Sequence, residues 1–266
     1  MDWSVAYDNR AAVPGAAALP ERWTQAASAF AATMGERHTR LAYGPGARES
    51  LDLFAPEGTS RGLAVFVHGG YWQRNGPEMF FHLGAGALAR GFTVAVPGYT
   101  LCPGTWVSAI TAEIAAAVSL AANQVAGPVH LSGHSAGGHL VARLLCRGAL
   151  GVGVAERLAP VLSISGIHDL RPLLNTPMNT ALGLDLAEAR TESPSLLDPI
   201  AGAALTAWVG AEELPELRRQ SRLIVETWGA LGRPMQLVED TGHDHFSVIE
   251  ALADPESPIV EAWLGN

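Results

Sequence analysis

The 266-residue sequence has few charged residues, few cysteines and no long apolar run. Only 16% of its residues are charged, against about a quarter in an average protein, and lysine and arginine form no run. The net charge of −9 argues against binding to nucleic acid or to an anionic membrane surface. With 48% apolar residues the chain can still bury a sizeable core, which excludes a fibre or a disordered tail.

The two cysteines, Cys102 and Cys146, form neither a metal-binding spacing nor a Cys-x-x-Cys pair, so we expect two free thiols. The N-terminal residues lack the basic start and apolar run of a signal peptide. The apolar stretches 61–67 and 114–122 are far shorter than the roughly 18 residues of a membrane-spanning helix. We therefore expect a soluble cytoplasmic protein that binds neither nucleic acid nor membrane, with a homodimer left open.

Short apolar segments alternate with amphipathic ones along most of the chain. The pattern predicts strands over residues 63–67, 93–97, 129–132, 161–165, 205–209 and 235–238. It predicts helices over residues 82–90, 108–123, 138–145, 215–231 and 258–264. Because strand–helix repetition brings parallel strands together, we expect an α/β fold with a mostly parallel central sheet and helices on both faces.

Other segments fall outside this repetition. Residues 41–43 and 49–54 alternate in polarity and predict an antiparallel hairpin at the edge of the sheet. Residues 1–35 predict an N-terminal arm and helix over the sheet. Residues 167–203 are too many for a simple crossover and predict a small helical cap or lid. Since no repeat or linker divides the chain, we expect residues 1–266 to form a single domain.

The strongest chemical signal is Gly133-His-Ser-Ala-Gly-Gly138, which follows the strand 129–132 and opens a helix. Gly-x-Ser-x-Gly in this setting is typical of a nucleophile elbow, a strained turn that holds the serine at its tip. Glycines flank the serine because a Cβ there would collide with the neighbouring strand or helix. The motif predicts Ser135 as a nucleophile, and a glycine-rich turn with a capping serine is the alternative.

A second motif, His68-Gly-Gly-Tyr-Trp72, directly follows a predicted strand. A serine nucleophile that attacks a carbonyl needs two N–H donors for the developing oxyanion. We expect one donor at Ala136, the residue after the nucleophile. We assign the other to Gly70, with Gly69 close behind, because small residues let the backbone approach a substrate.

The two aromatic residues that end this motif, Tyr71 and Trp72, come immediately after the predicted donors. We expect both to bind substrate by lining the pocket. The alternative is that they are buried structural aromatics.

The general base should be a histidine after the last strand, and the loop 242–246 offers His243 and His245. The apolar residues that follow His245 would anchor it at the start of a helix. We therefore favour His245 as the base over His243.

The acid that orients this histidine should follow the strand before the last one. Glu212 and Glu213 stand there, and Glu216 comes soon after. Adjacent side chains point in opposite directions, so only one of the pair can reach the imidazole, and we favour Glu213. The alternatives are Asp240 or Asp244 as the acid, or solvated carboxylates at a helix N-terminus.

The chain order Ser135, Glu213, His245 resembles that of α/β-hydrolases. Together with the two motifs it resembles the esterase/lipase superfamily, whose hormone-sensitive-lipase-like branch usually has a third glycine where Tyr71 stands. His-Gly-Gly-Tyr-Trp is closer to the kynurenine formamidase (arylformamidase) branch and its bacterial esterase relatives.

More of the chain is similar to that branch. Tyr7-Asp-Asn-Arg10 resembles its leading segment, residues 213–221 resemble its acid motif, and His245-Phe246 its histidine. Glu213 departs from the aspartate that is frequent in the branch. The extra methylene changes the geometry but keeps the carboxylate.

The resemblance implies a serine hydrolase that cleaves a carboxylic ester or an aryl formamide of a small substrate through an acyl-enzyme. The alternatives are an arylformamidase acting on N-formylkynurenine and a non-catalytic binding protein with the same fold. No metal or organic cofactor is implied.

Overall fold

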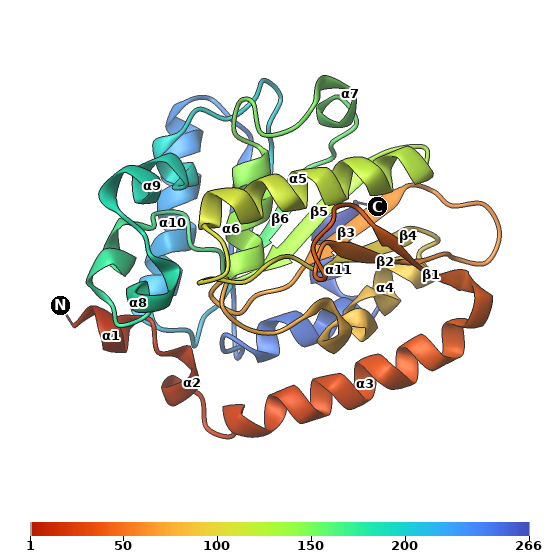
Figure 1. Ribbon diagram of the computed structural model, residues 1–266, viewed down its shortest axis with the longest axis horizontal. Coiled ribbons are helices and arrows are strands. Elements are labelled where there is room, and N and C mark those ends of the chain that lie inside the picture. Colours follow the sequence, from red (N-terminus) through yellow and green to blue (C-terminus); the bar gives the residue numbers. More distant parts are fainter. Residues whose placement is uncertain (1, 266) are drawn as a thin grey trace.

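The computed structural model describes residues 2–265 and contains an eight-stranded sheet in the order β1-β2-β4-β3-β5-β6-β7-β8 (Figure 1). β2 pairs antiparallel with β1 and with β4, and the later strands pair in parallel. The strands are β1 (His38–Ala42), β2 (Ser50–Phe54), β3 (Leu63–Val67), β4 (Thr93–Pro97), β5 (Val129–His134), β6 (Val161–Ile164), β7 (Leu205–Gly210) and β8 (Met235–Asp240). The sheet confirms the predicted α/β fold, including the antiparallel hairpin at its edge.

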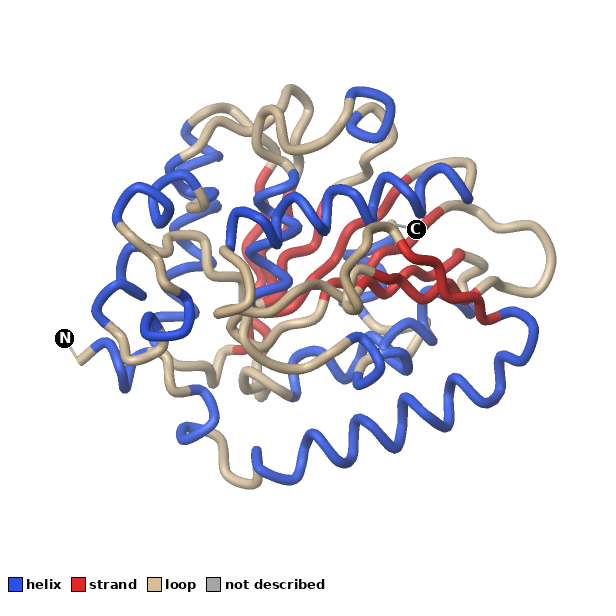
Figure 2. Tube along the Cα trace, in the orientation of Figure 1, coloured by secondary structure: helices blue, strands red, loops and turns tan. Residues whose placement is uncertain are grey.

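Helices cover both faces of this sheet, which lies between them in Figure 2. One face carries α5 (Val107–Gln124), α6 (Ala136–Leu144) and α10 (Pro215–Ala230), and the other carries α3 (Leu19–Met34), α4 (Ala85–Ala89) and α11 (Pro258–Leu264). The shorter helices are α1 (Trp3–Ala6), α2 (Asn9–Ala12), α7 (Val152–Ala155), α8 (Asn179–Leu182) and α9 (Leu186–Thr191). Among the described residues, no helix is both long enough and apolar enough to cross a membrane.

The strand β3 is apolar throughout because each face of the sheet has its own core. In β3, Leu63, Val65 and Val67 pack under α5 and α6, whereas Ala64 and Phe66 belong to the core on the opposite side. All five side chains are buried. A strand covered on both faces favours apolar side chains at every position, which is why residues 63–67 show a continuous apolar run rather than alternation.

The predicted helix 82–90 is wrong in part. The structure has a 3₁₀ turn over Phe81–Gly84, followed by the single short helix α4. Glycine weakens a helix, and here Gly84 permits close packing, since an added Cβ would lie 2.7 Å from Cγ1 of Val94.

The N-terminal arm and the segment 167–203 are built from short helices. Along the arm, α1 and α2 precede the long helix α3, which runs beneath the sheet in Figure 1. The segment 167–203 contains α8 and α9 between 3₁₀ turns, and lies beside α10 in Figure 1. Its role as a cap or lid stays a prediction.

The two cysteines, Cys102 and Cys146, are both buried and both free. Burial raises the pKa of each thiol, to about 11 for Cys102 and about 12 for Cys146. Neither is a reactive thiolate near neutral pH.

The turn from β5 into α6 brings backbone against backbone. α6 begins at Ala136, earlier than predicted, so that the helix follows the turn at once. A Cβ on Gly137 would overlap the carbonyl oxygen of Val67 at the end of β3, and a Cβ on Gly133 would overlap the carbonyl of Gly137. Glycine is therefore required at both positions by the close approach of neighbouring main chain.

Several histidines are buried within this packing. His139 on α6 is fully buried, and its Nε2 donates to the carbonyl oxygen of Glu192 over 2.7 Å. His168 is also fully buried, and burial lowers the pKa of both residues to about 3. Burial lowers the pKa of His68 to about 4. These imidazoles are neutral in the folded protein at physiological pH.

This burial predicts a loss of stability in mild acid. Below the ordinary histidine pKa of about 6.5, these histidines bind protons in the unfolded chain but stay neutral in the folded chain. The free energy of unfolding should be nearly flat above pH 7. It should fall between pH 6.5 and pH 5 by up to about 1.4 kcal/mol per pH unit for each such histidine. Urea unfolding across this range measures the slope of the free energy of unfolding against pH. The variant His139→Gln should reduce that slope by the contribution of one histidine, about 1.4 kcal/mol per pH unit. A free energy unchanged from pH 7.5 to pH 5 would contradict the expected neutral histidines.

The close contact at α6 predicts that Gly137→Ala destabilises the protein by about 3 kcal/mol or more, since main chain must move to admit the methyl group. Gly229→Ala is the matched control. Gly229 lies in α10 with no atom within 4 Å of an added Cβ, so this change should stabilise by about 0.5–1 kcal/mol. Urea unfolding measures both, and similar effects of the two changes would show that the contact is not restrictive.

Candidate active site

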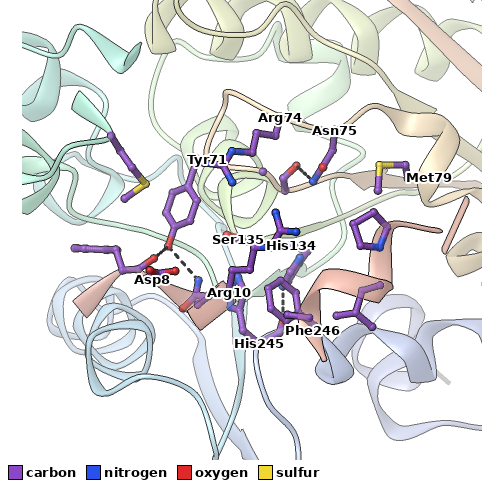
Figure 3. Close-up of a pocket in the computed structure, with 18 of the residues that line it drawn as sticks. Asp8, Arg10, Tyr71, Arg74, Asn75, Met79, His134, Ser135, His245 and Phe246 are labelled. Carbon is purple, nitrogen blue, oxygen red and sulfur yellow. Dashed lines mark hydrogen bonds between the residues drawn. The ribbon is translucent and has the colours of Figure 1, made fainter. Parts of the chain in front are cut away.

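A cavity of about 360 Å³ opens where β3 and β5 end (Figure 3). Its floor contains Ser135 and His245. The walls come from four parts of the chain: residues 4–23 of the N-terminal arm, residues 69–80 after β3, residues 176–178 of the predicted cap, and Phe246. Most of the wall is apolar, as is usual for a small-molecule site.

Ser135 lies on the turn between β5 and α6 in a strained conformation, with φ +56° and ψ −115°. Its N–H donates to the carbonyl oxygen of Ile164 over 2.8 Å, and its own carbonyl accepts from the N–H of His139. These two bonds hold a backbone conformation that non-glycine residues rarely adopt. The side chain faces the cavity as the predicted elbow requires.

The loop after β3 runs directly beside this serine. An added Cβ on Gly69 would lie 3.1 Å from Cβ of Ser135, and one on Gly70 would overlap the carbonyl oxygen of Arg74. Gly70 has φ +123°, which favours glycine. Among residues 2–265, no hydrogen-bond acceptor faces the N–H of Gly69, Gly70 or Ala136. Three free donors therefore lie on the two segments that meet at Ser135.

The aromatic residues that follow are separated by the fold. Tyr71 lines the cavity, and its hydroxyl donates to the carbonyl oxygen of Tyr7 over 2.6 Å. Trp72 does not line it, so the predicted role of Trp72 in the pocket is wrong. Its ring is fully buried edge-on against His139, with 5.0 Å between centroids. The two residues have φ of +51° and +56°, and this tight turn sends the second side chain down into the core.

Glu213 and His245 form a buried pair. Oε2 of Glu213 lies 2.7 Å from Nδ1 of His245, and Oε1 accepts from the N–H of Gly210 over 2.9 Å and from the hydroxyl of Ser165. The carboxylate therefore has three donors and is closed off from solvent.

The other candidate acids lie elsewhere. Glu212 is exposed, and its N–H donates to the carbonyl oxygen of His243. Glu216 is buried, but its carboxylate binds Arg219 and the hydroxyl of Tyr7. Asp240 accepts from the indole N–H of Trp208, and Asp244 caps the turn after its own position.

His245 is positioned through its backbone as well. The Asp244 carboxylate accepts from the N–H groups of Phe246 and Ser247, which fixes the turn. Nε2 of His134 donates to the carbonyl oxygen of His245 over 2.8 Å, and the two rings lie 4.6 Å apart. Burial, followed by the neighbouring His245, lowers the pKa of His134 well below its usual range, so this residue is a neutral donor. His243 has no contact with Glu213.

Ser135 and His245 both line the cavity, but no hydrogen bond joins these two residues in the structure. Such bonds are often long before substrate binds and tighten in the complex. The arrangement can supply a hydroxyl, an imidazole backed by a carboxylate, and free N–H donors at one space.

Two residues of the site were not predicted from the sequence. Ser165, just past β6, has φ +51° and is fully buried, and its hydroxyl contacts Glu213. A serine directly after a parallel strand next to the elbow strand was the available signal. Asn9 lines the cavity and donates to the hydroxyl of Tyr71 over 3.0 Å. The segment Tyr7–Arg10 carried a resemblance, but no spacing in it indicated a contact with the site.

Comparison with known proteins places this geometry in context. A family model described as "Alpha/beta hydrolase family" matches residues 64–264. Kynurenine formamidase from Salmo salar is 30% identical over 234 residues, covering 84% of this chain and 79% of that protein. Kynurenine formamidase from Danio rerio is 29% identical over 221 residues, covering 80% and 75%.

Solved structures are similar over comparable lengths. A crystal structure described as that of a proposed thioesterase from Silicibacter sp. TM1040 has a TM-score of 0.95 and 44% identity, covering 99% of both chains. Esterase 2 of Thermogutta terrifontis has a TM-score of 0.65 and 20% identity, covering 79% of this chain and 85% of that one, and shares the fold.

Proposed function

We propose that this chain, which belongs to the alpha/beta hydrolase family, is a serine hydrolase. It is related to kynurenine formamidases and esterases. It cleaves a carboxylic ester or an aryl formamide of a small substrate through an acyl-enzyme. One observation carries the proposal: His245, hydrogen-bonded to the buried Glu213, and the strained Ser135 face the same cavity.

The reaction begins when the hydroxyl of Ser135 attacks the substrate carbonyl and Nε2 of His245 takes its proton. The carbonyl oxygen becomes an oxyanion, which accepts hydrogen bonds from the N–H groups of Gly70 and Ala136, with Gly69 next to them. The tetrahedral intermediate then expels the alcohol or amine, which leaves with the proton from His245. An ester bond now joins Ser135 to the acyl group.

Water completes the cycle. His245 takes a proton from water as the oxygen attacks the acyl-enzyme, and the second intermediate collapses to the free acid. The proton returns to Oγ of Ser135, so the enzyme ends as it began.

Glu213 orients the imidazole throughout both steps. Its carboxylate accepts from Nδ1–H, so Nε2 is left free to accept the serine proton, and its charge stabilises the imidazolium that follows. The Gly210 N–H and the Ser165 hydroxyl bind Oε1, which leaves Oε2 directed at the histidine. These two hydrogen bonds to Oε1 fix the longer side chain of glutamate in place.

Hydrolysis of an aryl formamide is the second candidate. The 30% identity to a kynurenine formamidase favours it. The side chains of Trp23, Phe80 and Phe246 also line the cavity and suit an aryl group. Comparison of kcat/KM for N-formylkynurenine with that for p-nitrophenyl acetate and butyrate separates the two. An efficiency near the usual lower range of about 10⁴ M⁻¹s⁻¹ on the esters, with formamide turnover a hundredfold lower, would favour the esterase.

We expect an alkyl fluorophosphonate to label the wild-type protein covalently at Ser135, because the reagent needs an activated serine beside oxyanion donors. Ser135→Ala should abolish both labelling and ester turnover, and intact-mass spectrometry with peptide mapping measures the adduct. Ser165→Ala, a serine in the same site that does not face the substrate, should retain labelling at Ser135. Labelling that persists in Ser135→Ala would sink the assignment, and no labelling of the wild type would favour a binding protein.

We expect Glu213→Gln to lower kcat on p-nitrophenyl acetate by about 10³–10⁴-fold, because the neutral amide no longer holds the reactive tautomer of His245. Glu212→Gln removes the same charge from the neighbouring exposed residue and should change kcat less than about twofold. Steady-state kinetics on both variants decide the matter. Equal losses, or a greater loss at Glu212, would refute the choice of acid.

A further inference from the structure

All 17 basic residues of this acidic chain are arginines, and most contact a carboxylate or a main-chain carbonyl. Arg40 binds Asp52 on the sheet edge, and Arg48 donates to the carbonyl oxygen of Tyr99. Within residues 2–265, Arg10 and Arg74 have no such side-chain partner, yet both line the active-site cavity. Two arginine side chains without a hydrogen-bonded carboxylate partner therefore line the cavity in front of Ser135.

The two arginines reach the cavity from different walls, as Figure 3 shows. Arg10 comes from α2 in the N-terminal arm. Arg74 comes from the loop after β3, where its N–H donates to the carbonyl oxygen of Gly70 over 3.0 Å. Arg74 therefore lies one turn of chain from Gly70, which is also an expected oxyanion donor.

The arm that carries Arg10 is held firmly against the site. The hydroxyl of Tyr71 donates to the carbonyl oxygen of Tyr7, and the Tyr7 hydroxyl donates to Glu216 over 2.7 Å. Burial raises the pKa of both phenols above the usual range, so both remain donors. Asn9, next to Arg10, donates to Tyr71 as well. The arm next to Arg10 is thus held by hydrogen bonds to Tyr71 and Glu216.

The wall beside Arg10 also contains an unused acceptor. Oδ1 of Asn9 is buried and has no hydrogen-bond partner among the described residues, although its residue lines the cavity and is only 3% exposed. A buried acceptor without a partner is costly unless something binds it. Because an amide oxygen only accepts, this second observation indicates a ligand that brings an N–H or O–H group to this wall.

Negative charge in the same cavity is limited. Asp8 lines it, but its carboxylate accepts from the N–H of Ala11 and caps α2. The Glu213 carboxylate lies behind His245, with three donors of its own. Among the described residues that line this cavity, the two arginines outnumber the single carboxylate of Asp8, which leaves a net positive charge at the opening.

We propose that Arg10 and Arg74 form an anion subsite that selects substrates with a carboxylate beside the ester or amide to be cleaved. This inference rests on the proposed function and narrows its substrate class. A guanidinium binds a carboxylate through paired N–H groups, and two of them on opposite walls would fix its distance from Ser135. A cavity of about 360 Å³ suits a compact substrate of this kind.

The test compares two substrates that differ in charge but hardly in shape: 3-acetoxybenzoate and 3-acetoxybenzamide. A second pair, mono-4-nitrophenyl succinate and 4-nitrophenyl pentanoate, moves the carboxylate to the acyl side. We expect wild-type kcat/KM to favour the anion in at least one pair by about tenfold or more. The preference should shrink at high ionic strength.

Arg10→Gln and Arg74→Gln should each reduce this preference severalfold, and the double variant should bring the ratio near one. Arg147→Gln is the matched control, because Arg147 is exposed, has no side-chain partner among the described residues and lies outside the cavity. The control removes the same charge and should keep the wild-type ratio. A wild-type ratio near one in both pairs, or equal losses in the control, would overturn the proposal.

Binding to the Ser135→Ala protein separates this outcome from a failure of the proposed function. Calorimetry should give tighter binding of 3-acetoxybenzoate than of 3-acetoxybenzamide, and Arg10→Gln with Arg74→Gln in that background should abolish the difference. If the wild type hydrolyses neither compound but binding keeps this pattern, the subsite stands and the hydrolase proposal fails. If hydrolysis proceeds and binding is indifferent to charge, only the subsite is overturned.

Discussion

The backbone of α6 lies directly against the end of β3, and this contact brings the turn that carries Ser135 beside the loop after β3. Gly137 touches the main chain of Val67, so the loop after β3 must leave the sheet beside the turn that carries Ser135. The serine at the tip of this turn has the strained dihedral angles φ +56° and ψ −115°. N–H donors from both segments then converge without any side chain to hold them, which is the preorganisation that charge development needs.

Burial of the carboxylate–imidazole pair extends this constraint to the second half of the sheet. A carboxylate hidden from water is costly, and Glu213 has donors from Gly210, Ser165 and His245 to offset that cost. These partners come from β7, the end of β6 and the loop after β8. Neighbouring parallel strands are thus joined through the side chain of Glu213, and the geometry of the site depends on their register.

Sequence periodicity was sufficient for the sheet because its strands are covered on both faces and leave an apolar run. The elbow and Gly70 were equally visible, since local main-chain crowding selects glycine and a fixed spacing. Trp72 was misplaced because the direction of a side chain after a glycine depends on dihedral angles that the letters do not encode. Ser165 and Asn9 were missed for another reason: their partners lie far away in the chain, and only the folded arrangement brings them together.

The N-terminal arm has a consequence for how such proteins diverge. The residues matched by the family model begin at 64, whereas one wall of the cavity comes from residues 4–23. The proposed catalytic residues therefore lie within the family match, whereas one wall of the cavity comes from a stretch of sequence outside it. Relatives can keep the serine, acid and base unchanged and acquire a different substrate range by changes in a short leading segment. Relatives that share these three residues therefore need not share a substrate.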